Sequence, residues 1–198
     1  LSPVKLAYQD HEATVFVTPD YLAVGSDEDY VVIPMAPRTA MAIAREFGFT
    51  LPTRKLVDAI YRSSSTRLAP QPMQPGPAMT SNEYDREHDR RIKNQLSASG
   101  GTLALVAGHK KDLVLTPRLS EQPHRVAIYG WHRLVGRTIQ PLSLVHGIGY
   151  VDYSHGVRLV SRTALLDGES ADISLILRDS QLNPLLSDEG PVSTIGYL

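Results

Sequence analysis

The segment 129–160 holds the densest group of side chains that could carry chemistry, and it reads YGWHRLVGRTIQPLSLVHGIGYVDYSHGVRLV. Histidine and aspartate can transfer protons or bind a metal, and a serine hydroxyl can attack a carbonyl carbon once a base activates it. The candidate catalytic residues of this segment are His132, His146, Asp152, Ser154 and His155. We therefore expect the reactive centre here.

Metal-assisted chemistry is the first use of this set. Two of the three histidines with Asp152 would supply nitrogen and oxygen ligands and leave one position for an activated water. The candidate ligands are His132, His146, Asp152 and His155. Their spacing does not form the H-E-x-x-H pattern, so the sequence requires no cofactor, although a divalent metal such as zinc could bind.

Two further chemistries use the same segment without a metal. Ser154 could be a nucleophile whose base is His146 or His132, because His155 is adjacent to it and would point to the other face of a strand. Asp152 could instead work with a neighbouring histidine as general acid and base. A satisfied polar network at the end of a sheet would use these residues as well, and the sequence leaves the alternatives open.

Other side chains could bind the substrate. Arg158, Lys110 and Lys111 could position an anionic group, because the lysines follow a predicted strand in the run Gly108-His109-Lys110-Lys111-Asp112. The aromatic residues Trp131, Tyr150 and Tyr153 could stack on a sugar or another flat group. A chain that used only these aromatic contacts would be a non-catalytic cell-wall or carbohydrate-binding module.

The run Ser154-His155-Gly156-Val157-Arg158-Leu159 resembles the S-H-G-C-[I/V]-R-[L/M] signature of the L,D-transpeptidases of the bacterial cell wall. His146-Gly147 is a candidate for the His-Gly pair that lies upstream in that family. The nucleophilic cysteine of the family would fall between Gly156 and Val157, where this chain has no residue. The resemblance implies a β-rich catalytic fold acting on peptidoglycan stem peptides, with His155, Gly156 and Arg158 at the pocket.

Composition restricts the partners. The 198 residues carry 20 basic and 21 acidic side chains, so no broad electropositive surface for nucleic acid is expected. The apolar runs are far shorter than the ~20 residues of a membrane-spanning helix. The expected partner is therefore a polar substrate, polymeric or small, with no nucleic acid and no membrane span.

Two features bear on location. The chain has no cysteine, which excludes disulfides and leaves both the cytoplasm and a bacterial periplasm open. It begins at Leu1-Ser2-Pro3 without an initiator methionine, as a mature exported protein does. We expect a secreted or periplasmic protein, and a cytoplasmic one is not excluded.

Hydrophobic periodicity predicts the elements that position these residues. Short strands are expected at 13–17, 21–24 and 30–33, and helices at 37–47, from Thr53 to about 61, from Thr80 to about 96 and at 173–177. Later strands are expected at 103–106, 113–115, 126–129 and 157–160. The predicted fold is α+β, with a helical N-terminal half packed on a mostly antiparallel, β-rich C-terminal half.

Four prolines between 68 and 79 predict an extended connector. It would join an N-terminal α/β subregion, 1–67, to a β-rich functional subregion, 80–198, within a single domain. The function predicted from these features is an exported hydrolase acting on a polar polymer, peptidoglycan or polysaccharide, by His/Asp acid–base chemistry.

Overall fold

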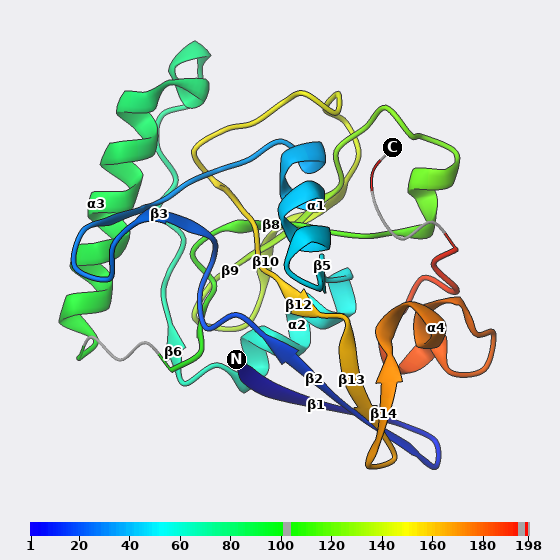
Figure 1. Cartoon of the computed structure of the whole chain (residues 1–198). Helices are drawn as coiled ribbons and strands as arrows, with labels where there is room; N and C mark the ends of the chain where they lie inside the picture. Colours follow the sequence, from blue (N-terminus) through cyan, green and yellow to red (C-terminus); the bar gives the residue numbers. More distant parts are fainter. Residues whose placement is uncertain (101–103, 194–196, 198) are drawn as a thin grey trace.

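The largest sheet joins the two ends of the chain. The computed structural model describes residues 1–100, 104–193 and 197 (Figure 1). Six strands pair in the order β14-β13-β2-β12-β5, with β1 added beside β2. They are β1 (Ser2–Tyr8), β2 (His11–Val17), β5 (Phe49–Thr50), β12 (Val160–Ser161), β13 (Thr163–Leu166) and β14 (Glu169–Asp172). The hairpin β1–β2 forms because Val4 and Leu6 alternate with exposed residues and face the core.

A second sheet carries most of the candidate site residues. Its order is β10-β9-β8-β11, with β8, β9 and β10 antiparallel and β11 parallel to β8. The strands are β8 (Lys111–Leu113), β9 (Ile128–His132), β10 (Thr138–Ser143) and β11 (His155–Gly156). Two smaller pairs complete the strands: β3 (Ala23–Gly25) with β4 (Tyr30–Val32), and β6 (Thr66–Arg67) with β7 (Val106–Ala107).

Four α-helices form near the places that periodicity predicts. They are α1 (Pro37–Glu46), α2 (Arg54–Ser63), α3 (Asn82–Ala98) and α4 (Ile173–Arg178). The Thr53 hydroxyl accepts from the Leu56 N–H and caps α2, and Asp172 caps α4 in the same way through Ser174. Ser81, one residue later than predicted, caps α3. Short 3₁₀ turns lie at η1 (Pro77–Thr80), η2 (Pro117–Ser120) and η3 (Asn183–Leu185).

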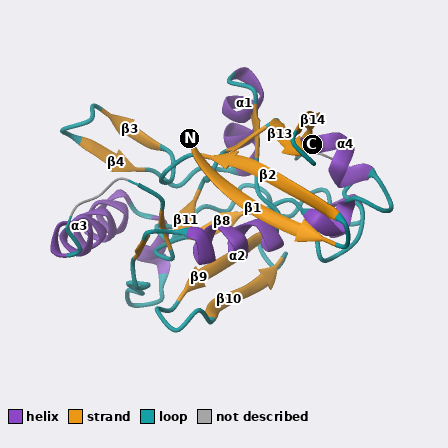
Figure 2. Ribbon diagram, turned by 90° about the horizontal axis from the view of Figure 1, so that it is seen from below, coloured by secondary structure: helices purple, strands orange, loops and turns teal. Residues whose placement is uncertain are grey.

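Helix α2 lies between the two sheets and forms the centre of the core. Figure 2 shows it between the β1–β2 hairpin and β9, and it contacts both. Its buried side chains, including Leu56 and Ile60, belong to one hydrophobic cluster that contains residues of both sheets. A smaller cluster of Leu68, Ile92, Leu96 and Val106 attaches α3 at one side of the molecule.

The predicted division into a helical N-terminal half and a β-rich C-terminal half is wrong. Helices and strands are mixed along the chain, since β1 to β6 lie in the first half and α4 lies near the end. The reason is that β2 pairs with β12 and β13, so strands from both halves build one sheet. The strand expected at 103–106 begins at Leu103, outside the described residues, and the described part of it contributes to β7.

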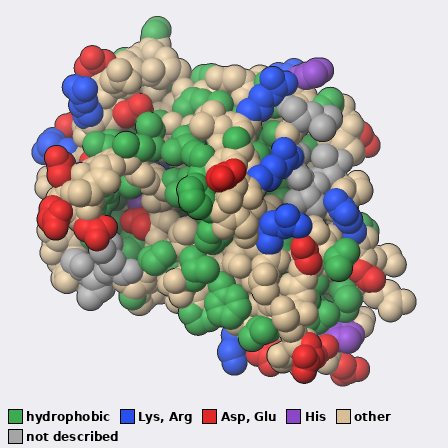
Figure 3. All heavy atoms as spheres, in the orientation of Figure 1, with side chains coloured by type: hydrophobic (Ala, Val, Ile, Leu, Met, Phe, Trp, Pro, Cys, Tyr) green, Lys and Arg blue, Asp and Glu red, His purple; other side chains and the backbone are tan. Residues whose placement is uncertain are grey.

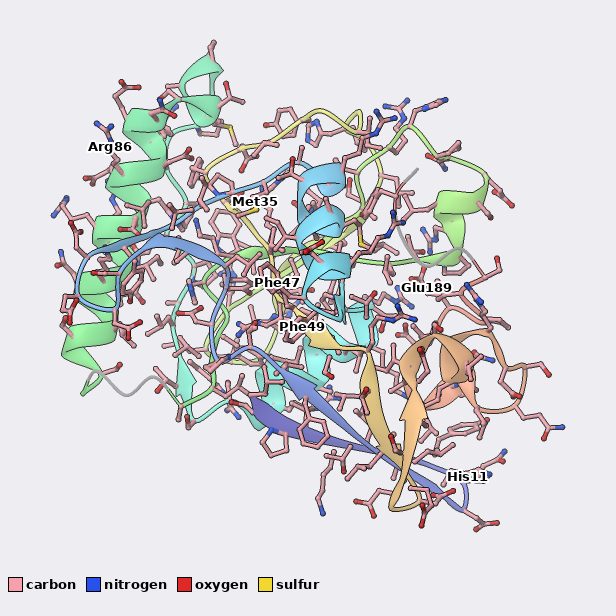
Figure 4. All side chains as sticks on the ribbon, in the orientation of Figure 1. His11, Met35, Phe47, Phe49, Arg86 and Glu189 are labelled. Carbon is pink, nitrogen blue, oxygen red and sulfur yellow. The ribbon has the colours of Figure 1, made fainter. Side chains whose placement is uncertain are left out.

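The last segment packs back on the body of the protein. Glu189, labelled in Figure 4, lies 3.1 Å from the Arg118 Nε and 3.9 Å from the Arg54 Nε. These ion pairs join the segment to η2 and α2. Among the described helices, none has the length and apolar character needed to span a membrane.

Candidate functional site

The parallel pairing of β8 and β11 brings two predicted segments side by side. His155 pairs with Lys111 and Gly156 with Asp112, and the Lys111 N–H donates to the Ser154 carbonyl at 2.7 Å. The lysine pair and the Ser-His-Gly run therefore lie next to each other in the fold.

Gly156 makes this site possible because it has no side chain. A Cβ at this position would lie 2.7 Å from the Tyr21 Cδ1 and 2.8 Å from the Lys110 Cβ. Both distances are far below van der Waals contact. The missing side chain is what allows Tyr21 and Lys110 to pack against the same strand.

The site is a cluster of buried ionisable groups, which we call the Lys110 cluster. Charged side chains are rarely buried completely, because removing them from water is costly. Here each member is at most 5% exposed: His88, Asp89, His109, Lys110, Asp112, Asp152, His155 and Arg158. Burying so many ionisable groups together lowers the stability of the folded state, and such clusters are typical of functional sites. In Figure 3 the face of the molecule is hollowed on the side that carries α3, with histidine and acidic side chains visible inside.

Lys110 lies at the centre of the cluster. Its Nζ donates to the Tyr153 carbonyl at 2.7 Å. Burial lowers the pKa of Lys110 to about 8, although the carboxylates of Asp85, Asp89 and Asp152 act in the opposite direction. An amine with such a pKa is partly uncharged near neutral pH and can act as a base or nucleophile.

Three histidines of the cluster are buried without a hydrogen bond to either ring nitrogen among the described residues: His88, His109 and His155. The His109 Nε2 lies 3.3 Å from the Asp20 Oδ1, closer than any described carboxylate oxygen lies to a ring nitrogen of His88 or His155. Burial lowers the pKa of His155 to about 4 and that of His88 to about 2, so both rings are neutral at pH 7. Unsatisfied polar atoms at this depth are costly, and each neutral ring keeps a lone pair for a ligand or a proton.

Asp152 organises the loop before β11. Its Oδ1 accepts from the Ser154 N–H at 2.8 Å and from the Ser154 hydroxyl, and its Oδ2 accepts from the Tyr150 hydroxyl at 3.1 Å. The His155 Nε2 lies 3.8 Å from Oδ2. Burial opposes ionisation, but His155 and the Ser154 hydrogen bonds outweigh it and lower the pKa of Asp152. The Ser154 hydroxyl thus donates to a carboxylate and not to a histidine base.

Arg158 is held by the protein itself. Its guanidinium donates to the Thr18 carbonyl at 2.9 Å and to the Val106 carbonyl at 2.6 Å, and stacks 4.3 Å from the Tyr21 ring centroid. The Tyr21 hydroxyl donates to Asp112 at 2.8 Å. Burial raises the pKa of Asp112 to about 6, although Arg158 and Tyr21 favour its charge. Arg158 therefore binds backbone carbonyls and the Tyr21 ring, and its charge stabilises the Asp112 carboxylate.

The aromatic residues do not form an open platform. Trp131 is 6% exposed and Tyr153 is 1% exposed. The Trp131 Nε1 donates to the His109 carbonyl at 3.0 Å, and its backbone has a positive φ of 58°, which is uncommon for a bulky residue. Tyr150 is the more accessible one and stacks on His146 at 3.9 Å. The geometry needed by a non-catalytic binding module is absent at Trp131 and Tyr153.

The four candidate metal ligands do not converge on one point, although His146, Asp152 and His155 all lie around Tyr150. His155 lies near Asp152, His146 stacks on Tyr150, and His132 pairs with Asp58 at 2.9 Å. Among the residues that the structure describes, no group of three or more histidine, aspartate or glutamate side chains is arranged to hold a metal ion.

Several members of the Lys110 cluster were not predicted. His109 and Asp112 directly flank the lysine pair, and alternation along that run could have indicated them. His88 lies on the apolar face of the helix predicted from Thr80 to about 96, a position typical of a hydrogen-bonded core histidine, but it makes no hydrogen bond. Tyr21 carries no signal in the sequence, because only the close packing on Gly156 brings it to the site.

No family model, curated protein or solved structure matches this chain.

Proposed function

We propose that the protein is a hydrolase of a polar polymer, peptidoglycan or polysaccharide, and that the Lys110 cluster is its reactive site. The observation that carries the proposal is the burial of Lys110 beside neutral, unpartnered histidines. A lysine with a lowered pKa and a neutral imidazole together form an acid–base pair that can operate near pH 8. The resemblance of the Ser-His-Gly run to the L,D-transpeptidase signature favours peptidoglycan within this class.

The proposed chemistry needs two proton transfers. The uncharged Lys110 amine takes a proton from water as the water oxygen bonds to the substrate carbon. A neutral ring N–H of His155 gives a proton to the leaving oxygen or nitrogen as the old bond breaks. The lysine proton then returns to His155, which restores both groups. Asp152 positions His155 and the loop, as the 3.8 Å contact between their side chains allows.

Substrate access requires the Pro-rich connector to move. The Met73 N–H donates to the Tyr153 hydroxyl at 2.8 Å, and the Tyr153 N–H donates to the Met79 carbonyl at 3.1 Å. Tyr153 in turn accepts the Lys110 hydrogen bond. The two hydrogen bonds to Tyr153 would have to break, together with the one from the Tyr84 hydroxyl on α3 to the Gln74 carbonyl, while the hydrogen bonds between Gln95 and Ala69 can hold the start of the segment. None of the bonds that break belongs to a sheet, so the segment can open while the sheets stay folded.

Asp152→Asn is expected to reduce kcat by at least about a hundredfold and to change KM by only a few fold, because an amide has one acceptor oxygen and cannot keep the hydrogen bonds from both Tyr150 and Ser154 that hold the loop carrying His155. Release of soluble fragments from purified peptidoglycan, and from a panel of polysaccharides, measures this.

The matched control is Asp172→Asn. Asp172 also accepts from the N–H of a serine two residues on, at 2.7 Å, but it caps α4 outside the cluster. The control should keep wild-type turnover. Equal turnover in wild type and Asp152→Asn, with both folded, would remove Asp152 from the mechanism.

Turnover is expected to rise with pH and to level off above about pH 8. The base must be uncharged, and burial lowers the pKa of Lys110 to about 8, so the active fraction grows about tenfold per pH unit below that value. His155, with a pKa lowered by burial to about 4, stays neutral throughout this range. A profile of kcat/KM from about pH 6 to about pH 10 tests this. A rate that is flat or falls between pH 6 and pH 8 contradicts a base role for Lys110.

A further inference from the structure

A second site lies away from the Lys110 cluster, and the proposed function does not use it. It is a cavity of about 660 Å³ between the last turns of α2 and the β9–β10 hairpin. A cavity of this size can hold a small organic molecule. The side chains that matter here are Asp58, Arg62, Arg67, Tyr129, His132 and Arg137.

The cavity carries an excess of positive charge. Three arginines line it, against the single carboxylate of Asp58. Arg67 is fixed in place, because its Nε donates to the Tyr61 carbonyl at 3.2 Å and its Nη2 to the Arg62 carbonyl at 2.7 Å. Neither Arg62 nor Arg137 forms a side-chain ion pair with any carboxylate that the structure describes. Two guanidinium groups therefore remain available to an anion.

The carboxylate of Asp58 is already occupied by donors. The Tyr129 hydroxyl lies 3.0 Å and 3.1 Å from its two oxygens, and the His132 Nε2 lies 2.9 Å from Oδ1. Burial and Asp58 raise the pKa of Tyr129 to about 12, so this hydroxyl keeps its proton. His132 also stacks on the Tyr61 ring at 4.3 Å. The floor of the cavity is thus rigid, and the repulsion of Asp58 toward an anion is reduced.

We propose that this cavity binds a small ligand through an oxyanion, a carboxylate or phosphate group, held by Arg62, Arg67 and Arg137. The planar fork of a guanidinium matches both groups through paired hydrogen bonds. The stacked Tyr61 and His132 rings and the exposed Leu134 and Val135 at the rim leave room for an apolar or sugar part of the ligand.

The test is isothermal titration calorimetry of the whole chain at low salt with two probes, inorganic phosphate and citrate. We expect at least one probe to bind at a single site, and the tighter of the two identifies the phosphate or the carboxylate class. The Arg62→Gln/Arg137→Gln double variant should weaken that binding at least tenfold, since both side chains are exposed and their loss leaves the fold intact.

The matched control is Arg133→Gln. Arg133 lies in the same hairpin and is exposed, but it does not line this cavity. It should bind the probe as wild type does. The proposal is overturned if neither probe binds to wild type, if the double variant binds as tightly as wild type, or if Arg133→Gln weakens binding equally.

Discussion

Replacing Lys110 with methionine is expected to make the folded protein more stable by about 1–2 kcal/mol at pH 7. Methionine fills a similar volume without the charge. Burial lowers the pKa of Lys110 from 10.5 to about 8, and each unit corresponds to about 1.4 kcal/mol, so the charged amine costs the folded state up to roughly 3 kcal/mol. Loss of the hydrogen bond to the Tyr153 carbonyl offsets ~1–2 kcal/mol of that gain.

The gain should depend on pH in a defined direction. At pH 7 Lys110 is mostly protonated in the folded state and fully protonated in the unfolded state, so nearly all of its cost is present. Between about pH 8 and pH 10.5 the unfolded chain binds more protons than the folded one, so wild-type stability rises with pH. The advantage of the methionine variant should shrink across that window.

Urea denaturation at pH 7 and at alkaline pH measures both effects. Lys5→Met is the control, because the Lys5 side chain is 75% exposed and its contact with Glu12 is a surface ion pair. The free energy of unfolding of Lys5→Met should remain close to that of wild type at both pH values. A Lys110→Met protein that is less stable than wild type at pH 7 would mean that the buried amine is a structural support and not a functional burden.

Gly156→Ala is expected to destabilise the fold by about 2–3 kcal/mol. The new methyl group would meet the Tyr21 ring at 2.7 Å and the Lys110 Cβ at 2.8 Å, and neither atom is the free end of a flexible chain. Relief requires β11 to move away from β8, which disturbs the pairing of His155 with Lys111. We therefore expect loss of activity together with loss of stability.

Gly149→Ala is the matched control, since a Cβ there has no atom within 4 Å and its backbone does not need glycine. Thermal and urea unfolding should give Gly149→Ala the stability of wild type. If Gly156→Ala is also unchanged, the close packing of Tyr21 and Lys110 on this strand is incorrect.

The helices could be predicted because their signals are local. The caps at Thr53 and Asp172 and the apolar faces of α1 and α2 are all contained in short stretches of sequence. The pairing of the strands into sheets could not be predicted, because β2 pairs with β12 and β13, which lie far along the chain. The alternating strand β1 was missed, and without it the first half of the chain was interpreted as mostly helical.

The same limit applies to the candidate site. The segment 150–158 and the Lys110-Lys111 pair were predicted to lie at one site because their residue types are unusual where they occur. The contact between His132 and Asp58 was not predicted, because Asp58 lies on α2, 74 residues earlier in the chain. The sequence does not show the positive φ of the Trp131 backbone or the burial of its side chain, so Trp131 stayed a candidate for stacking on a substrate.

The most direct test of the account is the release of soluble fragments from purified peptidoglycan and the polysaccharide panel at pH 8, by wild type, Lys110→Met and Lys5→Met at equal concentrations of folded protein. The account predicts turnover of one polymer by wild type and Lys5→Met, and a loss of at least about a thousandfold in Lys110→Met. Turnover that survives in Lys110→Met, or no release from any polymer by wild type, would contradict it.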